Sequence, residues 1–229
     1  MSVFSYGPVE RGVFQARPNR FIALVELDGA VRRCHVPNTG RLRELLLPGA
    51  VVWCRFHPEP GRKTAWTLLA VAHRGTVVNI DSQVPNRLAA DFVRSGGLGP
   101  VPDLVKPEQT FGDSRLDLYY EAGPVRGFAE VKGVTLNEDG VARFPDAPTE
   151  RGVKHLHSLA RAVEAGYRAA ALFVIQRSDV TRFEPNQARD PAFAQALREA
   201  AAQGVKLRAL TCTVTPGTLE ITGEVPVCL

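Results

Sequence analysis

Apolar and polar residues alternate through the first third of the chain. The alternation runs on both sides of Asp28-Gly29, a dipeptide that is typical of a tight hairpin turn. Further β-rich runs, GAVVWCRF, TAWTLLAVA and GTVVNI, follow and are interrupted by the turn-forming stretch PEPGRKT. Only residues 41–47 look helical. Several short strands with one helical insert predict a small β-barrel of OB type over residues 1–83.

The pattern changes near Asp81, where helical spacing replaces strict alternation. A helix is expected to end at Gly96-Gly97, and a Pro-rich connector follows it. After a hairpin, the chain alternates between helices and strands, which is typical of an α/β fold with helices packed on a mixed sheet. Residues 84–229 are therefore expected to form a second domain, in a two-domain α+β chain. Its expected elements are a hairpin over 111–136, a helix over 150–165, a buried strand over 169–176, a helix over 191–203 and two final strands.

The composition is that of an ordinary folded protein. Of the 229 residues, 45% are hydrophobic and 23% are charged, which argues against disorder. We expect no signal peptide, because no basic segment followed by an apolar run opens the sequence. No apolar stretch reaches the ~18–20 residues that cross a bilayer. The four cysteines lack metal-site spacing and are expected to be buried free thiols, so we expect a cytoplasmic protein without membrane contact.

The positive charge is concentrated in the N-terminal part. Residues 1–83 carry 11 Lys and Arg against 6 Asp and Glu, whereas the remainder carries 17 against 18. A basic domain is the expected partner of a polyanion such as DNA. Since Arg greatly outnumbers Lys throughout the chain, a biased genome composition is an equally good explanation for the Arg excess.

The most informative segment for chemistry is FAEVKGVTL, residues 128–136. It places Glu130 and Lys132 on one face of an expected strand. If the hairpin is symmetric about Gly123-Pro124, Asp117 lies directly opposite Glu130, with Cβ atoms about 4.5–5.5 Å apart. Two opposed carboxylates repel each other unless a cation lies between them. Lys132 alone could play this part, which leaves a structural ion-pair cluster as one interpretation.

A bound Mg²⁺ or Mn²⁺ is the other interpretation. Hard divalent cations prefer carboxylate oxygens and keep water ligands for chemistry. In phosphodiester hydrolysis such a cation polarises the phosphate and acidifies a bound water, while a nearby lysine stabilises the transition state. The pattern of two acids and one amine therefore predicts a metal-dependent active site formed by Asp117, Glu130 and Lys132.

Other residues could complete this site. Glu108 precedes the first strand of the hairpin and is expected as a further metal ligand, or else as an exposed loop acid. Gln176 ends a buried strand at the edge where α/β sheets place ligands, and is expected to be catalytic, or else a solvated strand end. The start of the helix at residue 150 could bind phosphate, or could simply be capped. The expected phosphate-binding side chains there are Arg151, Lys154 and His155.

The sequence as a whole resembles the sugar fermentation stimulation protein A (SfsA) family. The resemblance rests on RPNRF, HVPNTGRL, SRLD, EVKGVTL, FPDAPTERGVKHL and LFVIQR, which occur in this order over nearly the whole chain. It implies an OB-fold domain, a PD-(D/E)XK nuclease-like domain, DNA binding and a link to the regulation of sugar metabolism, notably maltose. In that pattern Asp117, Glu130 and Lys132 match the nuclease residues, and Leu116 replaces the name-giving proline.

DNA contacts are expected from Pro-, Asn- and Gly-rich stretches of the basic half, because Arg and Asn suit phosphates and base edges. RPNRF could instead be structural, with its Arg bracing the barrel against the second domain. The expected DNA-binding residues are Arg17, Asn19, Arg20, Asn38 and Arg41.

Three functions are compatible with the sequence. The first is a Mg²⁺-dependent nuclease with a DNA-binding barrel. The second is a non-catalytic DNA-binding regulator on a nuclease-like scaffold, and the third is a small-molecule or sugar-responsive protein whose Glu130–Lys132 pair is only structural. Site preference and oligomeric state are left open, with a homodimer among the options.

Overall fold

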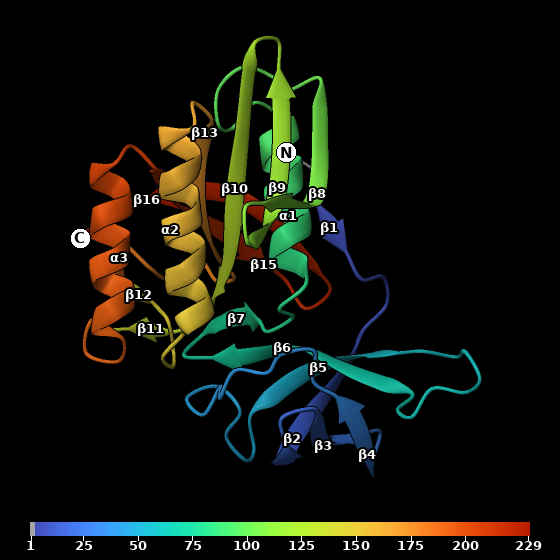
Figure 1. Cartoon of the computed structure of the whole chain (residues 1–229). Coiled ribbons are helices and arrows are strands. Elements are labelled where there is room, and N and C mark those ends of the chain that lie inside the picture. The colour runs from blue at the N-terminus through green and yellow to red at the C-terminus, as the bar shows by residue number, and fades with distance from the viewer. Residues whose placement is uncertain (1–2) are drawn as a thin grey trace.

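Two lobes divide the chain in the computed structural model, which describes residues 3–229 (Figure 1). The lower lobe is a barrel in which alternating apolar residues point inward, and β4 closes it by pairing in parallel with β6. Asp28 and Gly29 both have positive φ, as the expected two-residue hairpin turn requires. The small barrel predicted from the sequence is therefore confirmed. Its strands are β2 (Glu10–Asn19), β3 (Ile22–Leu27), β4 (Ala30–His35), β5 (Val51–Phe56) and β6 (Trp66–His73), with β7 (Thr76–Asn79) appended to β6.

The upper lobe is built on a seven-stranded mixed sheet in the order β1-β16-β15-β13-β10-β9-β8. Its centre, β13, pairs in parallel with both β10 and β15, and every residue of β13 after the first is buried, as expected for a central parallel strand. The strands are β1 (Phe4–Ser5), β8 (Leu104–Phe111), β9 (Ser114–Ala122), β10 (Val125–Val134), β13 (Arg168–Ile175), β15 (Lys206–Val214) and β16 (Thr218–Val225).

Helices cover both faces of this sheet (Figure 1). One core packs under α1 (Val84–Arg94), and the other lies between the sheet and the pair α2 (Glu150–Glu164) and α3 (Pro191–Ala202). A small sheet of β11 (Asn137–Glu138), β12 (Val141–Phe144) and β14 (Arg182–Pro185) lies beside α3. No helix in the described part of the chain is long and apolar enough to cross a membrane.

Four local expectations need correction. The helical insert at residues 41–47 is a single turn, because Leu42 has a φ of 48°, which a right-handed helix excludes. The Pro-rich connector contains β8, whose Pro107 lies on an edge strand where no N–H is needed. The first strand, β1, joins the sheet of the upper lobe rather than the barrel. Finally, Cys228 is exposed, whereas the other three cysteines are the expected buried thiols.

The ends of α2 and α3 are joined through one buried carboxylate, Asp190. Its Oδ1 accepts the N–H of Phe193 at 3.0 Å and caps α3, and its Oδ2 accepts the N–H of Thr149, the cap residue of α2, at 2.8 Å.

Asp190→Ala is therefore expected to lower the free energy of unfolding by roughly 2–3 kcal/mol, since it removes two bonds of a buried acid. Thr149→Ala removes one cap and is expected to cost about 1 kcal/mol. Urea unfolding measures both, and equal losses would contradict the shared role of Asp190.

Candidate active site

The β9–β10 hairpin has the register that its sequence predicts. Val125 pairs with Ala122, and the ladder continues without a shift to Ala129 opposite Leu118. The next pair in this register is Asp117 and Glu130, but the two strands part there. Instead, Asp117 Oδ2 accepts the backbone N–H of Val131 at 2.8 Å. The hairpin thus brings the two expected acids to the point where the strands diverge.

The side chains of β9 change face at Asp117. Leu116 packs into the core under α2 and α3, whereas Leu118, two residues further along, packs into the core under α1. Residues two apart on a straight strand would share one face. From α1, Asn86 donates its Nδ2–H to Asp117 Oδ1 at 3.2 Å. Sequence reasoning missed Asn86, because its helix is remote from the hairpin along the chain.

Glu130 lies in the interior, with an exposed fraction of 2%. Its Oε1 accepts two hydrogen bonds, one from Lys132 Nζ at 2.5 Å and one from His155 Nδ1. Its Oε2 is buried and has no hydrogen-bond partner. Burial alone would raise the pKa of Glu130, but the hydrogen bond from His155 and the charge of Lys132 outweigh it, so the pKa lies below its ordinary value. Glu130 is thus an ionised carboxylate with one unused oxygen.

His155 holds Glu130 in place from the first turns of α2. Arg151 donates from Nε to His155 Nε2 at 3.4 Å, which leaves the proton on Nδ1, facing Glu130. With an exposed fraction of 5%, His155 cannot reach a DNA backbone. The expected DNA contact is therefore corrected, and His155 is a positioning residue for the Glu130 carboxylate.

Asp117 has the opposite electrostatic environment. Burial raises its pKa, and the negative charge of Glu130 raises it further. The Val131 N–H, Lys132 and Asn86 offset only part of this effect. Two neighbouring acids whose pKa values move in opposite directions are a common property of catalytic sites. As the residues stand, the pair is destabilised and would gain from a further cation.

The residues present fit a hard divalent cation. The unpartnered Glu130 Oε2 and the carboxylate of Asp117 are two oxygen donors of the type that Mg²⁺ and Mn²⁺ prefer. In a strand, the N–H and C=O of one residue point to the same side, so the carbonyl of Val131 also faces the gap beside Asp117. Water would have to supply the other ligands. Within residues 3–229, no three His, Cys, Asp or Glu side chains are grouped to hold a metal.

Glu108 does not join these two acids. Its side chain is 63% exposed and lies 3.5 Å from Arg115, with which it forms a surface ion pair. Its backbone has a φ of 51°, an unusual conformation for a residue with a side chain. The exposed-acid alternative therefore describes Glu108 better than the expected role as a metal ligand.

Gln176 connects the two lobes. Its side chain is 1% exposed, and its Nε2 donates to Asn79 Oδ1 and to the carbonyl of Asp81, both at 2.8 Å. Next to it, the fully buried Arg177 binds the carbonyl of Thr135 at 2.9 Å and lies 3.3 Å from Nδ1 of His73 in the barrel. Gln176 is therefore not a solvated strand end, and its bonds support a structural role at the junction rather than the expected catalytic role.

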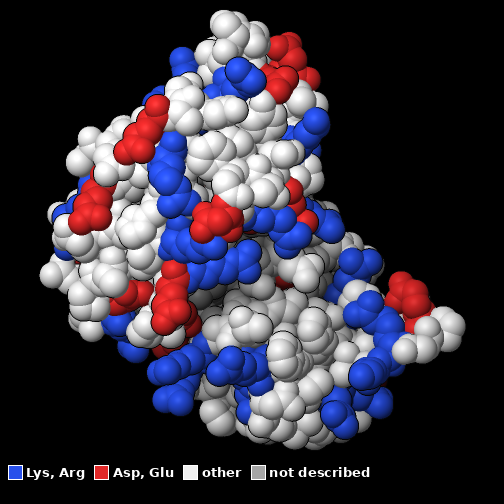
Figure 2. Space-filling model, in the orientation of Figure 1, with Lys and Arg blue, Asp and Glu red and all other residues white. Residues whose placement is uncertain are grey.

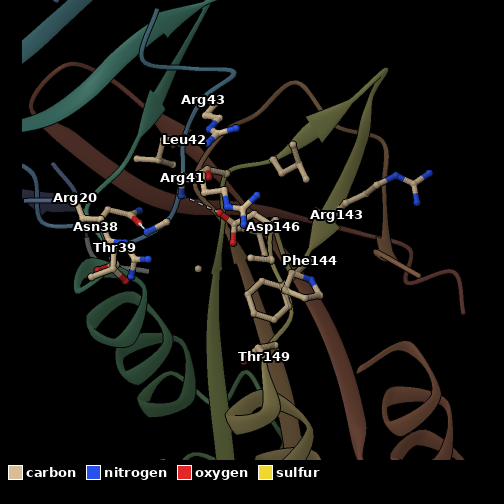
Figure 3. Close-up of a pocket in the computed structure, with 18 of the residues that line it drawn as sticks. Arg20, Asn38, Thr39, Arg41, Leu42, Arg43, Arg143, Phe144, Asp146 and Thr149 are labelled. Carbon is tan, nitrogen blue, oxygen red and sulfur yellow. Dashed lines mark hydrogen bonds between the residues drawn. The ribbon is translucent and has the colours of Figure 1, made fainter. Parts of the chain in front are cut away.

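A cleft of about 880 Å³ runs between the lobes. It lies between the barrel loop at residues 38–43 and the segment at residues 143–149, and Figure 3 shows the labelled side chains of both walls. The cleft is not lined by Asp117, Glu130 or Lys132, but its lining includes Gly133 and Val134, which follow Lys132 directly. The expected DNA-binding residues of the barrel all line it, namely Arg17, Asn19, Arg20, Asn38 and Arg41.

Three of these five residues are committed to the barrel itself. Arg17 donates four hydrogen bonds, at 2.8–2.9 Å, to backbone carbonyls of the barrel's own loops. Asn19 Oδ1 accepts two backbone N–H groups in the β2–β3 turn, and Asn38 bonds both Gly40 and the carbonyl of Ile80. The structural alternative thus holds for Arg17, although it braces a loop and not the second domain. Arg20 and Arg41 remain exposed, and no side-chain bond is recorded for either in the described chain.

The first turn of α2 is capped in the ordinary way. Thr149 Oγ1 accepts the N–H of Gly152 at 3.0 Å. Lys154 contacts Asp113 in the turn between β8 and β9. Its Nζ lies 3.1 Å from Asp113 Oδ2 and donates to the Asp113 carbonyl at 2.9 Å. Arg151 is exposed. DNA contact by Arg151 and Lys154 stays a prediction.

Comparisons with known proteins agree with this architecture. The family model described as the sugar fermentation stimulation protein RE domain matches residues 83–218, and the SfsA N-terminal OB domain matches residues 16–80. A sugar fermentation stimulation protein homolog from Desulfitobacterium hafniense is 50% identical over 94% of this chain and 94% of its own length. A homolog from Ruminiclostridium cellulolyticum is 46% identical over 98% of this chain and 99% of its own length.

Among solved structures, the Pyrococcus furiosus SfsA in complex with Ca²⁺ is 31% identical and superposes with a TM-score of 0.88 over 100% of both chains. The barrel is therefore an OB domain, and the upper lobe is a restriction-endonuclease-like domain. On these matches, the chain belongs to the sugar fermentation stimulation protein (SfsA) family.

Proposed function

We propose that this protein is a divalent-metal-dependent phosphodiesterase that acts on DNA. One observation carries the proposal: the ionised Glu130 keeps a buried, unpartnered oxygen beside a second carboxylate, Asp117. An unpaired buried acceptor costs free energy that a folded protein normally avoids. A relative of the same fold is described in complex with Ca²⁺, another hard divalent cation, which supports a cation at this position.

Each residue of the site has a distinct task in this proposal. Asp117 and Glu130 would hold Mg²⁺ or Mn²⁺, which would polarise the scissile phosphate and lower the pKa of a bound water. Asn86 and the Val131 N–H hold Asp117, and His155 holds Glu130, so that neither carboxylate has to reorganise during the reaction.

Lys132 supplies the positive charge of the chain itself. Its ammonium group is fixed 2.5 Å from Glu130 Oε1 and is 18% exposed at its side chain, so it is both oriented and accessible. From there it can orient the attacking water and stabilise the negative charge that develops on the phosphate in the transition state.

Cleavage of labelled DNA in Mg²⁺ or Mn²⁺ tests the proposal. Lys132→Met is expected to lower the rate roughly 100-fold or more while leaving Mn²⁺ binding in place, because it removes transition-state stabilisation and no metal ligand. Lys206→Met, on the exposed start of β15, is the matched control and should leave the rate unchanged. Cleavage that survives Lys132→Met would mean a contaminating nuclease or another site.

A non-catalytic DNA-binding regulator of sugar metabolism is the second candidate. The observation that favours it is the lack of a third acidic ligand near Asp117 and Glu130 in the described residues. It predicts DNA binding that weakens steeply with salt and no cleavage with any divalent cation. Lys132→Met would then leave DNA affinity unchanged.

A further inference from the structure

The interlobe cleft is strongly basic. Five of the residues that line the cleft are arginines, and Asp146 is the only acidic residue in this lining. Figure 2 shows Lys and Arg side chains gathered where the two lobes meet on this face. Arg143 forms ion pairs with Glu138 and Glu184, at 2.9 Å each. Its side chain points away from the other labelled arginines in Figure 3. The remaining four cleft arginines make no recorded ion pair within residues 3–229.

Arg41 and Arg43 are presented by a rigid loop. Between them, Leu42 is 3% exposed and packs into the barrel core, although its φ of 48° is unfavourable for a residue with a side chain. Behind the loop, the partly buried guanidinium of Arg17 binds the carbonyls of Asn38, Gly40 and Arg41. Burial and the nearby Arg20 lower the pKa of Arg17. These contacts hold the backbone from which the two arginines project, which reduces the ordering cost of binding a ligand.

The opposite wall touches this loop without closing the cleft. The backbone N–H of Arg41 donates to Asp146 Oδ2 at 3.2 Å, as the dashed line in Figure 3 shows. The guanidinium groups of Arg20, Arg41 and Arg43 remain exposed and without a recorded partner in the described chain. Their chemistry suits phosphate, which arginine binds with two parallel hydrogen bonds.

The size of the cleft distinguishes a single strand from a duplex. A volume of about 880 Å³ is within the range of roughly 300–1,000 Å³ that encloses a small ligand, and so holds only a few nucleotides. Phe21, which follows the cleft residue Arg20 in the turn between β2 and β3, is 56% exposed, an unusual position for a large aromatic side chain. Unpaired bases stack on such rings, whereas bases within a duplex cannot.

We propose that the cleft binds the phosphate backbone of a single strand of DNA through Arg20, Arg41 and Arg43, with Phe21 as a stacking platform, and leads that strand to the active site. The last step rests on the lining of the cleft, which includes Gly133 and Val134, the two residues that follow Lys132 in β10. The inference rests on the proposed function for the fate of the strand, but not for its binding.

Fluorescence anisotropy in EDTA tests strand binding without any cleavage. The probes are a labelled single-stranded oligonucleotide and the duplex of the same sequence. The triple variant Arg20→Ala, Arg41→Ala, Arg43→Ala should bind the single strand at least tenfold more weakly. The slope of the log binding constant against log salt concentration should become less steep by about 2, since each of the three lost phosphate contacts on a single strand contributes about 0.7. Phe21→Ala should weaken binding of the single strand at least threefold and leave duplex binding unchanged.

The matched control removes equal charge from strands β2 and β4 of the barrel. Arg11, Arg32 and Arg33 are exposed and have no recorded side-chain partner in the described chain, so their triple Ala variant should lose less than threefold in affinity. An equal loss in both triple variants would overturn the proposal, because binding would then follow net charge. Tighter binding of the duplex would overturn it too. If the cleft variant loses strand binding and the wild type cleaves no DNA, the inference stands while the proposed phosphodiesterase activity fails.

Discussion

Asp117→Asn is expected to abolish Mn²⁺ binding and, at the same time, to raise the free energy of unfolding of the metal-free protein by roughly 1 kcal/mol. The gain follows from the electrostatics of the pair, since burial and the charge of Glu130 both disfavour the ionised form of Asp117. Asparagine has nearly the same shape and removes the charge. The amide of Asn86 can turn over to keep its bond to the new side chain.

This result would separate the two interpretations of the site. If Asp117, Glu130 and Lys132 form only a structural ion-pair cluster, the wild type binds no Mn²⁺ and Asp117→Asn changes stability alone. If they form a metal site, stability without metal and metal affinity change in opposite directions. Isothermal titration calorimetry with Mn²⁺ and urea unfolding in EDTA measure the two quantities.

Glu108→Gln is the matched control for this experiment. It removes a carboxylate from the neighbouring strand, where the side chain is exposed and pairs with Arg115. It should leave Mn²⁺ affinity and stability nearly unchanged, because exposed ion pairs contribute about 0–1 kcal/mol. Weaker Mn²⁺ binding in Glu108→Gln would restore the role that the sequence suggests for this residue. Unchanged Mn²⁺ binding in Asp117→Asn would refute the metal site.

Arg177→Met is expected to produce the largest loss of stability, roughly 3–5 kcal/mol. Arg177 is fully buried, and its guanidinium binds Asp179 at 2.5 and 2.7 Å, the carbonyl of Thr135 and His73 of the barrel. Methionine fills similar volume but leaves these acceptors unpaired. Because the bonds join the segment after β10, the loop after β13 and the barrel, the two lobes should also unfold less cooperatively, as calorimetry can show.

The pH dependence of this loss has a definite sign. Burial would raise the pKa of Asp179, but the hydrogen bonds and charge of Arg177 outweigh it, so the folded-state pKa lies below its ordinary value. The contribution of the pair is therefore fully present above the unfolded-state pKa, about 3.9, and is lost as pH falls through the lower folded-state pKa. The difference between wild type and Arg177→Met should be constant from pH 7 to 5 and should shrink below about pH 4.

Arg182→Met provides the comparison. Arg182 pairs with Glu184 at 2.7 Å with the same two-residue spacing as Arg177 and Asp179, but its side chain is 46% exposed. The expected loss is small, because exposed ion pairs contribute little to stability. Similar losses in Arg177→Met and Arg182→Met would show that burial at the junction adds nothing to the ion pair.

The hairpin of the active site could be read from local sequence alone. A turn at Gly123-Pro124 and strict alternation determine which residues face each other, because a strand has a side-chain period of two. The register from Val125 opposite Ala122 to Ala129 opposite Leu118 confirms this prediction. Strand β8 was missed, since Pro107 and its flanking polar residues resemble a connector, and only pairing with β9 makes that segment a strand.

The roles of single side chains depended on contacts between distant segments. His155 and Lys154 are neighbours at the start of one helix, yet the first is buried against Glu130 and the second is exposed beside Asp113. The sequence contains both as equally plausible phosphate ligands. Burial, which is a property of the packed chain, separates them.

The sequence by itself determined the two-domain order, the register of the hairpin that carries both acids and the basic character of the barrel, because these follow from alternation, turn residues and charge, all of which are local. Only the tertiary structure decided that Asn86 holds Asp117, that Arg17 braces a loop and that Gln176 and Arg177 join the lobes. It also created the cleft, whose walls lie about a hundred residues apart in the chain. Contacts over such separations come from packing of whole elements, and no local pattern encodes them.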